Sequence, residues 1–173
     1  QLFNAFKKFL RELNPTGLHI IGDFLDLNSL SSHDRGKLGI KGITLDFEYK
    51  EGNRVLNELE SCLSNKCIKT YLYGNHEDRY FRYMKDVDHA KIGSAMQSPT
   101  DALNLKNRGY LVREDWKNDA IGLGPHLDLV HGEFINQHCA KKHIDTYRKS
   151  IIFGHSHRQQ SYIEGQTAGY NIG

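Results

Sequence analysis

Apolar residues recur along the chain in two patterns, one with helical spacing and one of short continuous runs. The helical stripe extends from Leu2 to Leu13, and Asn14-Pro15 ends it because proline cannot continue the helical hydrogen bonding. The short runs each suit a buried strand and lead into a turn with glycine: residues 18–22, 68–73, 127–130 and 151–153. The chain is therefore predicted to open with a helix and to contain a set of buried strands.

Segments with helical spacing separate these strands. Their apolar positions predict helices over residues 53–63, 77–87, 100–107 and 136–149. Residues 28–52 are polar and aperiodic, so we expect a long loop there, and residues 159–172 alternate like a hairpin. Helices that alternate with buried strands, without a linker or an internal repeat, predict one α/β domain over residues 1–173.

The composition is that of an ordinary globular protein. Hydrophobic residues make up 38% and charged residues 25%, and a formal net charge of +2 indicates neither a nucleic-acid surface nor a membrane surface. No apolar run has the length of a membrane span, no signal peptide opens the chain, and three cysteines without metal-knuckle spacing favour a cytoplasmic location. Because Gln1 lies inside the predicted opening helix and Gly173 closes no element, we expect the domain to be truncated at both ends.

Polar residues gather where the predicted strands end. The four turns are Gly22-Asp23-Phe24-Leu25-Asp26, Gly74-Asn75-His76-Glu77, His131-Gly132-Glu133 and Gly154-His155-Ser156-His157. In an open α/β sheet, ligand sites form outside the carboxyl ends of the strands. We therefore expect these turns, which are far apart in sequence, to meet in one crevice.

The residue types in these turns suit divalent metal ions. They offer one carboxylate that can bridge two cations, one amide oxygen and three imidazoles: Asp23, Asn75, His131, His155 and His157. Such a mixed nitrogen and oxygen set favours manganese, iron, zinc or nickel over calcium. Two ions about 3.5–4 Å apart can polarise a phosphoryl group and generate hydroxide. His76 is the candidate general acid for the leaving oxygen, since imidazole titrates near neutral pH.

The order of these turns resembles the calcineurin-like metallophosphoesterase superfamily. Four of its five signature blocks are present over residues 22–157: Gly-Asp-x-x-Asp, Gly-Asn-His-Glu, His-Gly and Gly-His-x-His. The resemblance implies a two-sheet β-sandwich flanked by helices, with a binuclear centre in which manganese is favoured. It implies that Asp23 bridges both ions, that Asn75, His131 and His155 serve one, that His157 serves the other, and that His76 assists the leaving group.

The first block of that family, Asp-x-His, is not found in this chain. It belongs on a strand that would precede the opening helix. We therefore expect two metal ions in the intact protein, and one or none in residues 1–173 alone, where only His157 and the Asp23 bridge remain for the second ion.

Several neighbours of the motifs have a structural interpretation beside the functional one. Asp26 is expected to order the loop rather than to bind metal, and Glu77 to cap a helix or orient a neighbour. His33 could reach substrate, whereas His138 and His143 are expected at the surface. The arginines near the motifs could contact phosphate, but a solvated face is the preferred interpretation: Arg35, Arg79, Arg82 and Arg158. The interleaved aromatic residues could stack on a base, and core packing explains them equally well: Tyr80, Phe81 and Tyr83.

Three classes of function are consistent with these motifs. The leading hypothesis is hydrolysis of a phosphomonoester or phosphodiester by a metal-activated water, with a DNA exonuclease of the repair type as an alternative and nucleic acid as a possible partner. A second class is a non-catalytic scaffold on the same fold. The third is a mononuclear zinc hydrolase, in which His131, His155 and Asp23 would supply the three ligands.

Overall fold

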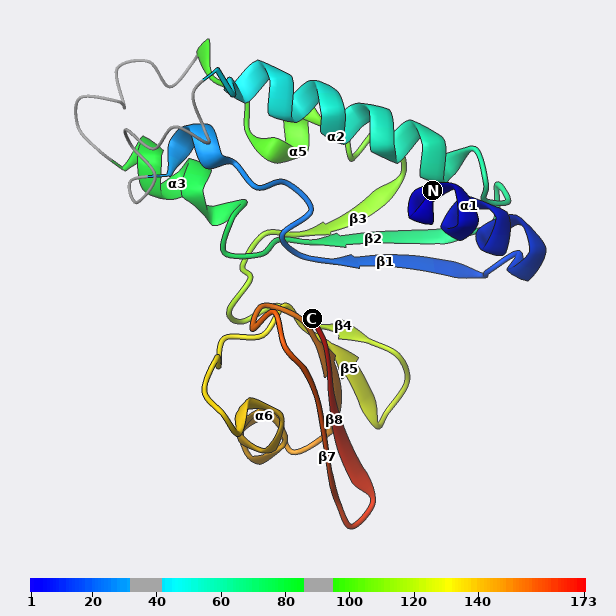
Figure 1. The fold of residues 1–173 in the computed structure, drawn as a ribbon, viewed down its shortest axis with the longest axis vertical. Coiled ribbons are helices and arrows are strands. Elements are labelled where there is room, and N and C mark those ends of the chain that lie inside the picture. The colour runs from blue at the N-terminus through cyan, green and yellow to red at the C-terminus, as the bar shows by residue number, and fades with distance from the viewer. Residues whose placement is uncertain (32–41, 86–94) are drawn as a thin grey trace.

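The computed structural model describes residues 1–31, 42–85 and 95–173, which form a mixed α/β fold with two sheets (Figure 1). The first sheet holds three parallel strands in the order β1 (Gly17–Ile21), β2 (Ile68–Leu72) and β3 (Tyr110–Arg113). Ile21 pairs with Leu72, and Leu72 pairs with Arg113. The three carboxyl ends are therefore level, and the turns that follow them begin at one edge.

Helices cover one side of the first sheet, and Figure 1 shows α2 running along it above the strands. The elements of this half, besides the strands, are α1 (Leu2–Leu13), η1 (Asn28–Leu30), α2 (Leu45–Glu60), α3 (Asp78–Met84) and α5 (Pro99–Ala102). The largest core lies between these helices and the sheet, with Leu56, Tyr71 and Leu103 fully buried in it.

The second sheet has five strands in the order β4-β5-β6-β8-β7. Its elements are β4 (Ile121–Gly122), β5 (Leu127–Leu129), α6 (Cys139–Tyr147), β6 (Ser150–Phe153), β7 (Gln159–Glu164) and β8 (Thr167–Ile172). β5, β6 and β8 run parallel, whereas the two outer strands are antiparallel to their neighbours. Helix α6 packs on this sheet through a core that contains Ala140, Ile151 and Phe153.

A small apolar cluster joins the two sheets. Leu72 from β2 meets Ile121 from β4 and Leu129 from β5, with Ile21 and Ile152 at its margin. The carboxyl ends of β1, β2, β5 and β6 are thereby directed at the junction of the sheets (Figure 1). The expected α/β class and two sheets with helices are confirmed, and the sandwich arrangement stays a prediction.

Most of the predicted elements are confirmed, with shorter bounds. The opening helix, the strands near residues 18, 68, 127 and 151, and the closing hairpin are all present. The helices expected over 100–107 and 136–149 end earlier or begin later than predicted, at Ala102 and at Cys139. The helix expected over 77–87 covers Asp78–Met84, and residues 86–87 lie outside the described part of the chain.

The prediction of a loop over residues 28–52 is wrong in its last part. Helix α2 begins at Leu45, where the Thr44 hydroxyl accepts a hydrogen bond from the Phe47 amide and caps the helix. The buried stripe then runs through Tyr49, Gly52 and Leu56. Gly52 signalled a loop in the sequence, but here it provides space, because a Cβ atom would lie 2.7 Å from a Leu25 methyl group.

Two strands were missed altogether. Strand β3 has four residues and β4 has two, and both lie between polar segments that conceal their alternation. Within the described residues, no helix has both the length and the apolar character that a membrane span requires.

Candidate metal centre

Three of the predicted ligands converge where the two sheets meet. Asp23, His131 and His155 each present a ligand atom, and these atoms lie within 4.8 Å of one another. The Oδ1 atom of Asp23 is 3.5 Å from Nε2 of His131, and Oδ1 of Asn75 is 3.0 Å from the same nitrogen. The structure therefore brings together turns from β1, β2, β5 and β6, as the sequence predicts.

His131 is the most enclosed of these groups, with 1% of its surface exposed. Its Nδ1 atom is 3.0 Å from the carbonyl oxygen of Ile21. When Nδ1 donates its proton to that carbonyl, the lone pair of Nε2 faces Asp23 and Asn75. A ring oriented through its second nitrogen in this way is typical of histidines that bind metal ions.

The Asp23 carboxylate is held in a crowded corner. Asp23 has a left-handed backbone with φ +53°, and its Oδ1 accepts a hydrogen bond of 3.0 Å from the His76 amide. A Cβ atom on Gly74 would lie only 2.1 Å from that same oxygen, and one on Gly22 would lie 2.4 Å from Nδ1 of His131. Glycine is needed at both positions because the ligand groups occupy the space of a side chain.

Glu77 lies beneath this corner and is fully buried, with 0% exposure. Its Oε2 accepts hydrogen bonds from the amides of Asp23 and Gly74, at 2.9 and 2.8 Å. Its Oε1 accepts from the Leu25 amide at 3.0 Å and from the Tyr71 hydroxyl at 2.9 Å. The side chain makes no capping bond to helix α3, so of the two expected roles it has that of orienting its neighbours.

Burial is the main cause that raises the pKa of Glu77, and the negative charge of Asp23 adds to it. The amides of Leu25 and Gly74 oppose this rise, because they stabilise the ionised carboxylate. Among the residues that the structure describes, Glu77 is therefore held in the interior by directed N–H and O–H donors rather than by a cation.

His76 lies at the margin of the cluster, between two aspartates. Its Nε2 is 4.0 Å from Oδ2 of Asp23, and its Nδ1 is 3.4 Å from Oδ1 of Asp26 without forming a hydrogen bond. The Asp26 side chain is 69% exposed and is not part of the three-ligand cluster. This position agrees with Asp26 as a neighbour of His76 rather than a metal ligand.

The fourth turn differs from the prediction in its backbone. His155 and His157 are two residues apart, a spacing that puts side chains on the same side of an extended segment, but both are left-handed, with φ +67° and +54°, and lie in a bend. The two side chains consequently do not have the common direction that an extended segment would give them. His155 joins the cluster, whereas His157 is exposed and lies outside it.

Burial lowers the pKa of His155, and the neighbouring His131, His157 and His76 lower it further, while Asp23 acts in the opposite direction. A histidine with a lowered pKa is neutral at neutral pH and keeps a lone pair for a cation. The ring centroids of His155 and His131 are 4.9 Å apart.

Sequence reasoning missed Trp116, which forms a wall of the centre. Its ring centroid is 5.7 Å from that of His131 and 5.8 Å from that of His155. It is the single tryptophan of the chain and stands between the charged residues Glu114 and Lys117. An aromatic residue in so polar a segment was the one available signal.

The arginines near the motifs fix loops. Arg79 donates to the Asp26 carbonyl at 2.8 Å and to the Asn28 side chain at 3.0 Å. Arg82 donates to the Asn75 carbonyl at 2.7 Å and forms an ion pair with Asp78.

The remaining residues near the motifs lie in the core, at the surface or outside the described part of the chain. Tyr80 and Phe81 pack against the first core, which supports their structural interpretation, and Arg158 is exposed. The predictions for His33 and Arg35 lie outside the described residues. His138 is exposed, as expected.

The prediction that His143 lies at the surface is wrong, because its exposure is 0%. Its Nδ1 lies 2.7 Å from the carbonyl oxygen of Cys139, and its Nε2 accepts a bond of 3.2 Å from the Glu133 amide. The ring also stacks on Phe153, with centroids 3.9 Å apart. Helix α6 turns this residue inward, to the face that contacts the second sheet.

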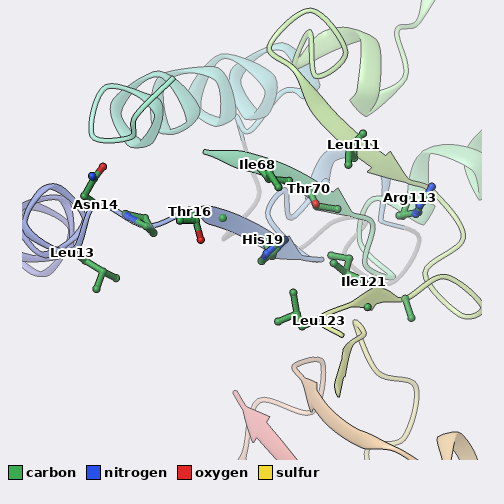
Figure 2. Close-up of a pocket in the computed structure, with 14 residues that line it drawn as sticks. Leu13, Asn14, Thr16, His19, Ile68, Thr70, Leu111, Arg113, Ile121 and Leu123 are labelled. Carbon is green, nitrogen blue, oxygen red and sulfur yellow. The ribbon is translucent and has the colours of Figure 1, made fainter. Parts of the chain in front are cut away.

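A large groove lies away from the cluster, on the face of the first sheet opposite α2. It has a volume of about 820 Å³ and begins beside Thr16 and Gly17, at the amino end of β1. Figure 2 shows His19, Thr70 and Leu111 along one wall, with Ile121 and Leu123 of the β4 region facing them. None of the candidate ligands lines this groove, so its size does not mark the metal centre.

Comparisons with protein-family models, with curated proteins and with solved structures gave no match to this chain. The chemistry of the centre therefore has to be argued from its own residues.

Proposed function

We propose that the chain is the core of a metal-dependent phosphoesterase, which hydrolyses phosphate esters with a metal-activated water. The observation that supports this proposal most is the meeting of Asp23, His131 and His155 within 4.8 Å, from three separate turns. A half-buried carboxylate with two imidazoles is a donor set that suits manganese, iron or zinc. The two sheets would stack as a sandwich in the intact domain, with this centre at their junction.

The proposed role of each residue follows from its position in the centre. Asp23, Asn75, His131 and His155 would hold one divalent ion, and His157, together with the Asp23 bridge, would serve a second in the intact protein. Bound ions would polarise the phosphoryl group and lower the pKa of a water molecule. The Ile21 carbonyl keeps the His131 ring oriented, and Gly22 and Gly74 leave the ligand atoms their space.

His76 would protonate the leaving oxygen. Its Nε2 faces the Asp23 side of the cluster at 4.0 Å, while its Nδ1 lies 3.4 Å from Oδ1 of Asp26. A positioned imidazole acts as a general acid without needing to bind the metal itself. This separates the roles of two adjacent residues, since Asn75 would bind the ion and His76 would move the proton.

A mononuclear hydrolase is the second candidate, and one observation favours it. Within the described residues, three groups form the cluster, which is the number of protein ligands in an open catalytic zinc site. His157 lies outside the cluster. Metal content of the purified protein separates the candidates, since the mononuclear enzyme holds one ion per chain at saturation.

The test titrates the protein with Mn²⁺ and with Zn²⁺ and follows the fluorescence of Trp116, which lies beside two candidate ligands. Hydrolysis of nitrophenyl phosphate, bis-nitrophenyl phosphate and DNA is then measured with each metal. The His76→Ala variant should lower kcat by roughly 10²–10⁴-fold and leave metal affinity unchanged, as expected for loss of a general acid.

The exposed His138 supplies a matched control, because His138→Ala also removes an imidazole but should change neither metal affinity nor turnover. Equal metal binding by Asp23→Ala and the unmodified protein would contradict the proposed centre. Full activity of His76→Ala would remove that residue from the mechanism, and inertness toward DNA would remove the nuclease alternative.

A further inference from the structure

Glu77 connects the two turns that carry the first ligands. Its Oε2 is shared between the amide of Asp23, after β1, and the amide of Gly74, after β2, at 2.9 and 2.8 Å. These turns are more than fifty residues apart in sequence, and they belong to neighbouring parallel strands. One carboxylate oxygen therefore fixes the distance between the backbones that present Asp23 and Asn75.

The other oxygen of Glu77 anchors the same corner from below. Oε1 accepts from the Leu25 amide at 3.0 Å and from the Tyr71 hydroxyl at 2.9 Å. Tyr71 is itself completely buried in the first core. The carboxylate is thus tied on one side to the ligand turns and on the other to a rigid strand.

Glu77 has no access to a substrate. It is fully buried, and each of its oxygens already accepts two hydrogen bonds. Its effect on the centre must act through the residues that it holds. The left-handed backbone of Asp23 is the part that needs such support, since a non-glycine residue adopts this conformation at a cost in free energy.

We propose that Glu77 is a positioning residue for the metal centre and sets its affinity, in addition to stabilising the fold. This inference rests on the proposed function. A carboxylate suits the role because it offers only acceptors, and all four neighbours are donors. A glutamine would direct an NH₂ group at some of these donors, and the Asp23 and Gly74 turns would separate.

The test compares Glu77→Gln with Tyr71→Phe in the full chain. Both variants break hydrogen bonds of the same buried network, but Tyr71→Phe leaves the bonds to Asp23 and Gly74 in place. Glu77→Gln should weaken Mn²⁺ binding, measured by Trp116 fluorescence, by about 10–100-fold, as is usual for partners of metal ligands. Tyr71→Phe should lower the melting temperature and keep the Mn²⁺ affinity within about threefold of the unmodified protein.

A second readout does not depend on metal. Without added metal, amide hydrogen exchange at Asp23, Leu25 and Gly74 should accelerate in Glu77→Gln and remain slow in Tyr71→Phe. If Glu77→Gln does not fold, Glu77→Asp replaces it, because the shorter side chain keeps the charge but cannot reach both turns. The same acceleration and the same loss of Mn²⁺ affinity are then expected.

The inference would be overturned by unchanged Mn²⁺ affinity in a folded Glu77 variant, or by equal losses of Mn²⁺ affinity in the Glu77 and Tyr71→Phe variants, which would mean a purely structural role. Unchanged exchange at the three amides would overturn it as well. Failure of the proposed function would look different. The protein would bind Mn²⁺ without hydrolysing phosphate esters, or the unmodified protein would not bind Mn²⁺ at all. In the second case, hydrogen exchange at the three amides still tests whether Glu77 holds the turns.

Discussion

The two sheets present their ligands in different ways. The turns of the first sheet are fixed from inside the protein, by a buried carboxylate that binds the amides of Asp23 and Gly74. The turn between β6 and β7 in the second sheet is fixed differently: the buried Asn171 donates a hydrogen bond to the hydroxyl of Ser156, and His155 and His157 on either side have left-handed backbone. The comparison teaches that one half of the centre is preorganised through main-chain amides, whereas the other is held through a side-chain hydroxyl beside the ligand.

The largest effect on metal binding is expected in the half of the centre that the second sheet provides, where substitutions distinguish the roles of His155 and His157. His155→Ala removes a member of the three-ligand cluster, so saturable metal binding should be lost. His157→Ala removes an exposed side chain outside the cluster and should weaken binding by no more than about tenfold, the lower limit of the 10–100-fold effect that is usual for partners of metal ligands. Isothermal titration with Mn²⁺ measures both. Equal losses would mean that His157 moves into the centre when metal binds.

The first-sheet half can be broken without removing a ligand. Gly74→Ala places a Cβ atom where it would lie 2.1 Å from Oδ1 of Asp23, so the carboxylate must move. Turnover should fall roughly 10²-fold, as for a displacement of about 1 Å in a catalytic group. Gly122→Ala is the matched control, since its nearest neighbour would lie at an ordinary 3.6 Å. Normal turnover of Gly74→Ala would show that this corner is not tightly held.

The smallest effect is expected on stability, and it comes from His143, which is buried between helix α6 and the second sheet. Burial lowers the pKa of His143 from its ordinary value of 6.5, so the unfolded chain takes up a proton more readily than the folded one. Its contribution to stability is therefore complete above pH 6.5 and is lost as the pH falls from 6.5 to the lowered pKa, with a slope of at most about 1.4 kcal/mol per pH unit.

Urea unfolding between pH 7.5 and 5 measures this slope. His143→Gln should give a flatter dependence of the unfolding free energy on pH than the unmodified protein. His138→Gln, at an exposed position of the same region, controls for the substitution itself. Parallel curves for His143→Gln and the unmodified protein would exclude this histidine as a source of acid sensitivity.

The sequence predicted the turns at the ends of the strands well. It predicted poorly the elements whose apolar positions lie among polar residues. Glycine after an apolar run marked the turns that carry Asp23, Asn75 and His155. At Gly22 and Gly74 the reason is that ligand groups fill the space that a side chain would take. The first half of α2 was missed because Gly52 resembles a loop residue, although its role is to let the helix approach Leu25.

Other features depend on contacts that no local pattern contains. The burial of His143 follows from the way α6 lies on the second sheet, and Trp116 reaches the centre only through tertiary folding. The departure of His157 from the cluster follows from the left-handed bend, whereas spacing alone suggested an extended segment. Residue types thus predicted which turns meet better than they predicted which side chains join the cluster.

The anchoring by Glu77 also bears on how this protein can vary. Three of its four donors are main-chain amides, which every residue except proline provides. The hydrogen bonds of Glu77 therefore depend on the course of the main chain and not on which side chains the bonded residues carry. As far as this contact is concerned, the side chains of the first turn can change while the Asp23 carboxylate keeps its place.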